Sequence, residues 1–246
     1  MGTGREMLAI HCEPAIAWQD PFAQKMQFGL NALGIKSRMT PSRIRETDTA
    51  ILLGTTFWRG IEADGDYLLV DRCSFGDTNQ WVSLVWNGHG RRGDHKVPKD
   101  KQKRVHDLGL FVGSWRDGKK TILCGQHEAY SPHYDSLPQW YKTIKATHFR
   151  PHPQGDNPTG LPLARNFDDC GLVITLNSSI AVDSVMMGIP TVTMDEASMA
   201  WDATSHNPTM RYFTERKQWL AWLAWTQWTH DEISAGYPIK HLFEEL

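Results

Sequence analysis

The sequence LVITLNSSIAVDSVMMGIPTVTM, which runs from Leu172 to Met194, predicts a strand, a helix and a second strand in immediate succession. The apolar residues before Asn177 are typical of a strand buried inside a parallel sheet, and Gly188 is a typical end of a helix. Strand, helix and strand in this order form the repeating unit of α/β proteins. The segment therefore predicts a parallel sheet covered by helices.

The same alternation continues on both sides of this segment. Strands are expected over residues 7–12, 49–54, 67–71, 81–86, 121–124 and 147–150, and helices over residues 20–33 and 137–144. From Tyr212 to Trp228, Trp and Leu recur at helical spacing, and Thr229 with Glu232 predicts a capping box. We therefore expect an α/β protein with two halves, residues 1–115 and 116–210, followed by amphipathic helices over residues 211–246.

The composition is that of an ordinary folded protein. The chain has 246 residues, 40% of them hydrophobic and 22% charged, which excludes a disordered or collagen-like chain. No apolar run is long enough for a transmembrane helix, and the first residues lack the apolar core of a signal peptide. We therefore expect a cytoplasmic protein, in the host cytoplasm if the source is viral. The four Cys are widely spaced without a CxxC pair, which argues against a zinc knuckle or a disulfide framework.

One segment carries a strong local charge. The whole chain has 26 Lys and Arg against 28 Asp and Glu, which gives a net charge of -2. Between Gly88 and Arg104, however, seven cations oppose two acids, which gives a local net charge of +5. A segment so rich in Gly, Lys and Arg predicts an exposed and mobile loop. It is either simply solvated or a local patch for an anionic partner.

Two strand ends carry residues suited to an anion. Ser178 and Ser179 follow the strand that ends at Asn177, so we expect two hydroxyls and the free N–H groups of the next helix to lie together. Arg150 and His152 follow another strand, and the C-terminal ends of parallel strands share one edge of a sheet. Arg and His both donate hydrogen bonds to phosphate oxygens. The sequence therefore predicts a phosphate site, with a helix cap at Ser178 and a structural His152 as the plainer alternatives.

The loop FRPHP and the strand-Ser-Ser-helix-Gly-Ile-Pro-strand unit, within residues 121–194, resemble a known family. They are similar to the C-terminal, donor-binding half of glycosyltransferases of the two-Rossmann GT-B architecture, in the branch of bacterial capsule sugar transferases and sialyltransferases. The resemblance implies two Rossmann-like halves that face each other across a cleft, a C-terminal helix that braces the first half, a nucleotide-sugar donor, most commonly a UDP-sugar, and no metal. The donor residues that it implies are Arg150, His152, Ser178 and Ser179 at the phosphates, Gly125 and Gln126 beside them, and Asp195 or Glu196 at the ribose or base.

A transferase of this kind also needs a base that takes the proton of the acceptor hydroxyl, and the resemblance implies that the first half supplies it. Asp71, directly after the apolar strand at residues 67–70, is the first candidate. Asp77 is the second. Acids at strand ends are also common turn residues, so a structural role is the alternative for either one.

Small proteins of this architecture resemble bacteriophage enzymes, some of which glycosylate 5-hydroxymethylpyrimidines such as 5-hydroxymethylcytosine in DNA. This resemblance gives the basic segment a function, because its cations can neutralise the phosphates of double-stranded DNA. The DNA-binding candidates are Arg91, Arg92, Lys96, Lys99 and Lys101, and candidates for stacking on a flipped base are Phe57, Trp58, Phe75 and Trp86. The alternatives are a saccharide or lipid-linked acceptor, a nucleotide-sugar epimerase, and a non-catalytic protein that binds nucleotides or nucleic acid.

Overall fold

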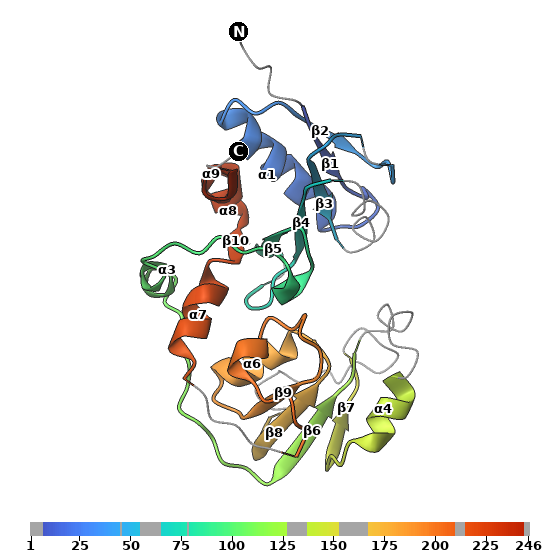
Figure 1. Cartoon of the computed structure of the whole chain (residues 1–246), viewed down its shortest axis with the longest axis vertical. Coiled ribbons are helices and arrows are strands. Elements are labelled where there is room, and N and C mark those ends of the chain that lie inside the picture. The colour runs from blue at the N-terminus through green and yellow to red at the C-terminus, as the bar shows by residue number, and fades with distance from the viewer. Residues whose placement is uncertain are drawn as a thin grey trace. The chain divides into compact units, whose positions relative to one another are not determined.

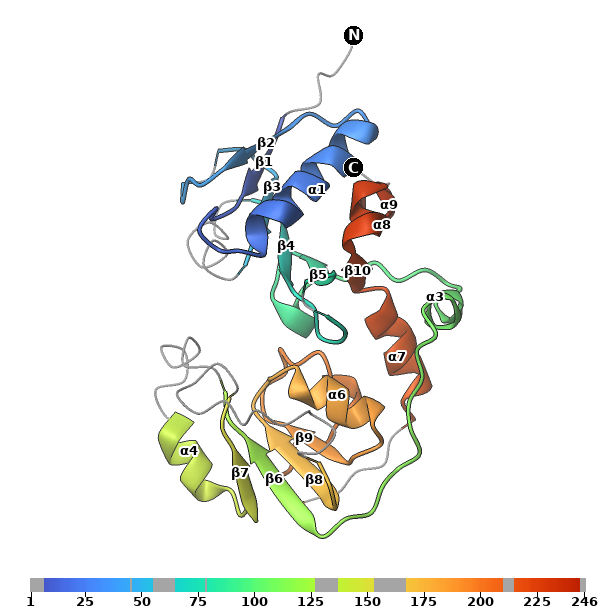
Figure 2. The same cartoon turned by 180° about the vertical axis from the view of Figure 1, so that it is seen from behind.

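The computed structural model of the protein describes residues 7–44, 46–54, 65–77, 79–126, 137–152, 167–209 and 215–243. Contacts within the chain divide it into two units, of which one is Met1–Lys101 with Trp222–Leu246 and the other is Gln102–Ala221. Each unit contains its own β-sheet (Figure 1, Figure 2). The chain is therefore an α/β protein with two Rossmann-like units, and the predicted fold class is confirmed.

The first unit has a six-stranded sheet in the order β10-β5-β4-β3-β1-β2. Its strands are β1 (Leu8–His11), β2 (Ser37–Thr40), β3 (Ala50–Leu53), β4 (Tyr67–Arg72), β5 (Trp81–Trp86) and β10 (Gln227–Thr229). The strands β1, β2, β3 and β4 run parallel, whereas β5 and β10 are antiparallel to their neighbours. The carboxyl ends of the four parallel strands therefore share one edge, and Asp71 lies there near the end of β4. The sequence did not indicate β2, because SRMT is polar and lies on an open edge of the sheet.

Three helices cover one face of this sheet. They are α1 (Gln19–Ala32), α8 (His230–Ser234) and α9 (Tyr237–Phe243), which bring Phe22, Ile233 and Leu242 into one core with alternate strand residues (Figure 1). The helix α8 approaches α1 so closely that a Cβ on Gly29 would lie 2.1 Å from the carbonyl oxygen of Ile233. The C-terminal helices thus pack on the first unit, as the sequence resemblance implies.

The basic segment is not the open loop that its composition predicts. Backbone groups of Asp94 and Trp86 exchange hydrogen bonds of 2.7 and 3.2 Å, and Gly90–Arg92 forms a 3-10 turn, η1. The helix α3 (Gln102–Asp107) begins within the segment and buries Arg104. Glycine permits this packing, because a Cβ on Gly93 would lie 2.1 Å from Cγ2 of Val85. Local charge therefore did not decide the structure of residues 88–104, since the backbone of Asp94 pairs with β5 and residues 102–104 lie in α3.

The second unit has a four-stranded parallel sheet in the order β7-β6-β8-β9. Its strands are β6 (Lys120–Cys124), β7 (His148–Arg150), β8 (Cys170–Thr175) and β9 (Thr191–Thr193). The helix α6 (Ile180–Met186) covers one face and α4 (Leu137–Thr143) the other, through Ile180 and Trp140 respectively. Among the described residues, Trp201–Ala203 (η3) and Lys217–Ala224 (α7) also form helices. None of the helices in the described ranges has the length and apolarity to cross a membrane.

The helix predicted to reach Trp228 ends earlier. The helix α7 stops at Ala224, and Gln227–Thr229 forms β10, in which Gln227 pairs with Ser83 of β5. Helical spacing of Trp could not indicate this strand, because its pairing partner lies far away in the sequence. Residues 210–214 of the predicted helix lie outside the described residues. The predicted capping box is present, since Thr229 and Glu232 exchange hydrogen bonds at the start of α8.

Candidate functional site

Four strand ends lie at one edge of the second sheet. The four strands run parallel, so their carboxyl ends share this edge. Gly125 follows β6, Arg150 ends β7, and short loops after β8 and β9 carry Asn177 and Asp195. The eight donor residues predicted from the sequence all lie on these four strand ends: Gly125, Gln126, Arg150, His152, Ser178, Ser179, Asp195 and Glu196.

A side-chain contact connects two of these strand ends. Nδ2 of Asn177 donates a hydrogen bond to Oδ2 of Asp195 at 2.8 Å, and Oδ1 of Asp195 accepts one from the backbone N–H of Ala197 at 2.9 Å. Asp195 is only 6% exposed, whereas its neighbour Glu196 is exposed. The Asp195 carboxylate therefore holds the edge together. Asn177 was not among the predicted site residues. Its place directly after a buried strand is the sequence pattern that could have indicated it.

Gly125 and Gln126 bring the ends of β6, β7 and β8 together. The backbone N–H of Gly125 donates to the carbonyl oxygen of Arg150 at 2.8 Å, and a Cβ on Gly125 would lie 3.3 Å from the backbone nitrogen of His152. The close approach of the two loops thus depends on a glycine. Oε1 of Gln126 accepts a hydrogen bond of 3.4 Å from the backbone N–H of Asn177.

The two serines lie where the helix α6 begins. Ser179 occupies the N-cap position, but its side chain makes no capping hydrogen bond, and it is exposed. The Ser178 hydroxyl accepts only a long contact of 3.5 Å from the backbone N–H of Ile180. Helix capping was the plainer interpretation of the two serines. Neither hydroxyl, however, makes a short capping hydrogen bond.

Arg150 lies near a partly buried acid that was not among the predicted site residues. Arg150 and Cys124 are register partners on adjacent strands, and Cys124 packs with Ile180 of α6, so the Arg150 side chain leaves the sheet on the α6 face. Asp183 lies on α6. Burial raises the pKa of Asp183 to about 7, and the positive charge of Arg150 opposes that rise. Nε of Arg150 is buried and has no hydrogen-bond partner in the described part of the chain. The site thus combines an Nε–H of Arg150 that has no hydrogen-bond partner among the described residues with a carboxyl group whose pKa is raised to about 7.

The two base candidates lie in the first unit and have different surroundings. Oδ2 of Asp71 lies 3.5 Å from Nε2 of His89, and Oδ1 accepts a hydrogen bond of 2.8 Å from the backbone N–H of Arg72. Asp77 is exposed, and its Oδ1 accepts hydrogen bonds of 2.9 and 3.1 Å from the backbone and side chain of Asn79. Asp71 therefore has an imidazole neighbour, whereas Asp77 closes its own turn.

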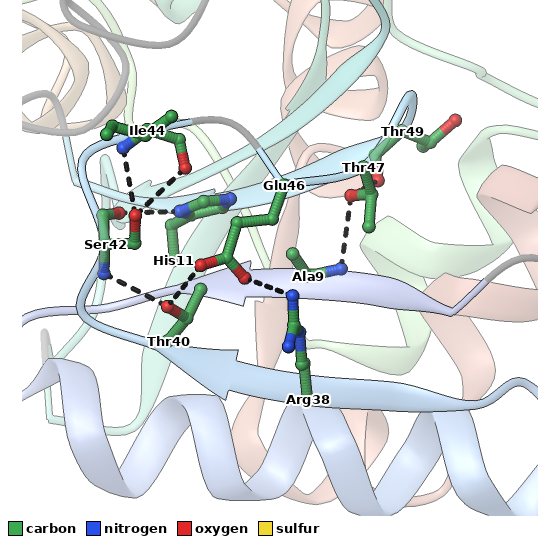
Figure 3. A network of polar contacts seen from close by, with 9 residues as sticks. All are labelled: Ala9, His11, Arg38, Thr40, Ser42, Ile44, Glu46, Thr47 and Thr49. Carbon is green, nitrogen blue, oxygen red and sulfur yellow. Dashed lines mark hydrogen bonds and ion pairs between the residues drawn. The ribbon is translucent and has the colours of Figure 1, made fainter.

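A polar network fixes the loop that follows β2 in the first unit (Figure 3). Nδ1 of His11 donates to the carbonyl oxygen of Ser42 at 2.8 Å, and the Thr40 hydroxyl donates to Oε1 of Glu46 at 3.2 Å. Oε2 of Glu46 forms an ion pair with Arg38 at 2.7 Å. His11 is fully buried. It was not among the predicted site residues, and these contacts give it a structural function at the end of β1.

The five cations expected to contact DNA differ in exposure. Arg92 and Lys99 are exposed, whereas Arg91, Lys96 and Lys101 are partly buried. Nζ of Lys96 also donates a hydrogen bond of 2.9 Å to a backbone carbonyl oxygen of α9. Arg92 and Lys99 are therefore the two cations whose substitution tests DNA binding most directly.

Two of the four aromatic candidates are unsuited to stacking on a base. Phe75 packs against Trp81, and Trp86 packs against Phe243; both Phe75 and Trp86 are buried in the first unit. The candidates Phe57 and Trp58 lie outside the described residues.

Neither metal ligands nor a reactive thiol stand out in the described ranges. They contain no group of three or more His, Cys, Asp and Glu placed to hold a metal ion. The four Cys are buried free thiols. Burial raises the pKa of Cys12 to about 11 and that of Cys124 to about 12, so both remain protonated at neutral pH.

Comparisons with known proteins support the fold. No protein-family model matches the sequence, and no curated protein matches it. Among solved structures, KpsC of Thermosulfurimonas dismutans, a beta Kdo 2,7 transferase, is 11% identical with a TM-score of 0.53, over 96% of this chain and 99% of that chain. This likeness supports the two-domain GT-B fold. Two further solved structures have TM-scores too low to bear on the fold. The xylose-binding transcription activator XylR is 11% identical with a TM-score of 0.26, over 91% of this chain and 63% of that chain. The 3-phosphoglycerate dehydrogenase of Entamoeba histolytica is 8% identical with a TM-score of 0.24, over 97% of this chain and 95% of that chain.

Proposed function

We propose that this protein is a metal-independent glycosyltransferase that moves a sugar from a nucleotide sugar, most commonly a UDP-sugar, to a hydroxymethylated pyrimidine base in DNA. The observation that supports the proposal is the carboxyl edge of the second sheet, where a guanidinium and an imidazole follow β7 and two hydroxyls follow β8. Carboxyl edges of parallel sheets are the usual place for nucleotides in such folds.

The chemistry of the edge suits a nucleotide phosphate that leaves with the electrons of the sugar–oxygen bond. Negative charge grows on the phosphate in the transition state, and a preorganised guanidinium stabilises it without further movement of solvent. The buried Nε of Arg150 supplies a donor for this purpose. The hydroxyls of Ser178 and Ser179, with weak or no capping contacts, are suited to the remaining phosphate oxygens.

Support for a DNA acceptor comes from the first unit. Arg91 and Arg92 follow His89, whose imidazole lies 3.5 Å from the Asp71 carboxylate, the proposed base. Cations in the same loop as the neighbour of the base are suited to an acceptor that carries phosphates, and they supply affinity rather than sequence recognition. A saccharide acceptor is the second candidate, because the structural neighbour KpsC is described as a Kdo transferase.

Calorimetric titration with UDP and with CMP tests the donor site. We expect one of them to bind the wild-type protein. We expect the double substitution of Ser178 and Ser179 by Ala to weaken binding at least about tenfold, the lower end of the cost of one hydrogen bond to a charged group. The substitution Ser114→Ala is the control, because Ser114 is exposed and does not lie on the four strand ends. Binding of neither nucleotide would contradict the proposal.

Mass spectrometry tests the acceptor. The protein is incubated with a panel of UDP- and CMP-sugars and a duplex that contains 5-hydroxymethylcytosine, with the unmodified duplex and a capsule-type oligosaccharide in parallel. A gain of one sugar mass on the hydroxymethylated duplex alone supports the DNA acceptor. A gain on the oligosaccharide alone replaces it with the saccharide acceptor, and interconversion of the free donor indicates an epimerase. Nucleotide binding without any turnover indicates a non-catalytic protein.

A further inference from the structure

Asp71 lies on the face of the first sheet opposite to α1, α8 and α9. That face carries a small apolar cluster that includes Leu69 and Val85. Side chains two residues apart in a strand share a face, so Asp71 lies on the same face as Leu69. Its register partner Ser83 is likewise two residues from Val85 in β5. The carboxylate is therefore at the carboxyl end of β4, beside this cluster.

A glycine-rich loop packs over the same face. A Cβ on Gly88 would lie 2.4 Å from Cα of Gly93, and a Cβ on Gly93 would lie 2.1 Å from Cγ2 of Val85. The backbone pair between Trp86 and Asp94 closes the loop at its base. Gly88 and Gly93 therefore let the loop fold tightly enough to bring His89 to Asp71.

We propose that this loop belongs to the acceptor site and that His89 is a positioning residue for the base Asp71. The proposal rests on the proposed glycosyltransferase function. The Asp71 side chain is 29% exposed and that of His89 is 17% exposed, so the carboxylate is the more accessible of the two groups. Nε2 of His89 lies 3.5 Å from Oδ2, while Oδ1 is held by the backbone N–H of Arg72. Contacts of this length in a free enzyme tighten when the substrate binds.

The proton and electron changes follow from these positions. The acceptor O–H bond breaks and its proton passes to the Asp71 carboxylate, while the acceptor oxygen forms a bond to the anomeric carbon of the sugar. The bond from that carbon to the nucleotide phosphate breaks, and the phosphate keeps its electrons. His89 fixes the orientation of the carboxylate before the transfer and donates through Nε2 to Oδ2.

Variants of His89 test this assignment through kinetics. Transfer from UDP-glucose to a duplex with 5-hydroxymethylcytosine is followed for the wild-type protein, Asp71→Asn, His89→Ala and His89→Gln. We expect His89→Ala to lower kcat about 10- to 100-fold with little change in the KM for the donor, the effect of losing one hydrogen bond to a charged group. We expect His89→Gln to recover most of the activity, because its amide nitrogen can replace Nε2.

Rescue by Gln and the KM for the donor separate positioning from a general structural defect. A general defect would weaken UDP binding and would not be repaired by Gln, whereas loss of the His89 donor lowers kcat alone. Wild-type kcat in His89→Ala would overturn the proposal. Calorimetric UDP binding, expected to be unchanged in both variants, shows whether the donor site remains intact.

A measurement that needs no activity distinguishes failure of this inference from failure of the proposed function. The imidazole NMR signals of His89 are compared in the wild-type protein and in Asp71→Asn, with Asp77→Asn as the matched control. We expect the loss of a carboxylate oxygen 3.5 Å from Nε2 to change the chemical shifts of the His89 ring, and we expect Asp77→Asn to leave them in place. Unchanged ring shifts in Asp71→Asn overturn the pairing, even if transfer is observed. Changed ring shifts in a protein without transferase activity support the pairing and overturn its assignment to a transferase base.

Discussion

Nδ2 of Asn177 and Oδ2 of Asp195 lie 2.8 Å apart and connect the strand ends of β8 and β9. The contact buries a carboxylate that also accepts a hydrogen bond from a backbone N–H. A buried carboxylate needs such donors, because desolvation without them is costly. The pair therefore stabilises the edge at which we propose that a nucleotide binds.

Substitution of Asn177 by Leu is expected to destabilise the protein. It removes a donor from a buried carboxylate, a change that costs about 1–3 kcal/mol in the free energy of unfolding. Urea denaturation followed by tryptophan fluorescence measures the difference. Glu196→Gln is the control, since Glu196 is exposed next to the pair and we expect its midpoint to stay near the wild-type value. Equal midpoints for Asn177→Leu and the wild type would show that the contact contributes nothing.

The partly buried Asp183 predicts a specific dependence of stability on pH. Its pKa rises from 3.8 to about 7 because of burial, so between these values the folded state binds more protons than the unfolded chain. The stability that this group contributes is complete below pH 3.8 and is lost as the pH rises through 7. Asp183→Asn should therefore raise the free energy of unfolding at pH 8 by about 2 kcal/mol relative to the wild type, with little difference at pH 4.

Urea denaturation at pH 4, 6 and 8 measures this effect. Asp168→Asn is the matched control, because Asp168 is an exposed acid in the same unit. We expect the control to follow the wild-type pH dependence. A parallel dependence for Asp183→Asn and the wild type would be incompatible with a proton held by Asp183 in the folded state.

Arg150→Lys is expected to weaken nucleotide binding. Lysine keeps the charge but loses the planar set of donors that matches phosphate oxygens, so we expect the Kd of the nucleotide to rise about tenfold. Calorimetric titration measures the change, with Lys142→Ala, an exposed cation of α4, as the control. An unchanged Kd in Arg150→Lys would remove Arg150 from the site.

The exposed cations of the basic segment predict a salt dependence of DNA binding. The double substitution of Arg92 and Lys99 by Gln removes two exposed charges and leaves the hydrogen bond from Lys96 to α9 in place. We expect weaker binding of duplex DNA and a smaller slope of log K against log salt, by about 0.9 for each phosphate that is no longer neutralised. Fluorescence anisotropy at several salt concentrations provides the slopes. Replacement of Lys25 and Lys36, two exposed cations of the same unit, should leave the slope unchanged.

Gly29→Ala tests how closely the C-terminal helices pack on the first unit. The added Cβ would lie 2.1 Å from the Ile233 carbonyl oxygen, so α8 must move. We expect a loss of about 3 kcal/mol in the free energy of unfolding, at the upper end of overpacking effects. Gly34→Ala provides a comparison without a steric clash, because nothing lies within 4 Å of its Cβ, although its φ of +73° favours glycine. A smaller loss for Gly29→Ala than for Gly34→Ala would contradict the close packing.

Much of the second unit could be predicted from its sequence because the relevant signals are local. The apolar run that ends before Asn177, the two serines after it and the glycine at position 188 set a strand, a helix start and a helix end within a few residues of one another. Parallel strands necessarily share their carboxyl edge. The predicted donor residues were therefore placed on one edge by sequence order alone, while their chemical function stays a prediction.

The sequence determined these elements and the capping box at Thr229 because each depends on neighbours along the chain. Only the tertiary structure decided that His89 lies beside Asp71, that Asp183 lies near Arg150, and that Gln227 joins β5. These contacts join residues 18, 33 and 144 positions apart, by subtraction of their sequence numbers. No local pattern of hydrophobicity or charge encodes them, since they depend on which chain segments pack together and which side chains lose water there.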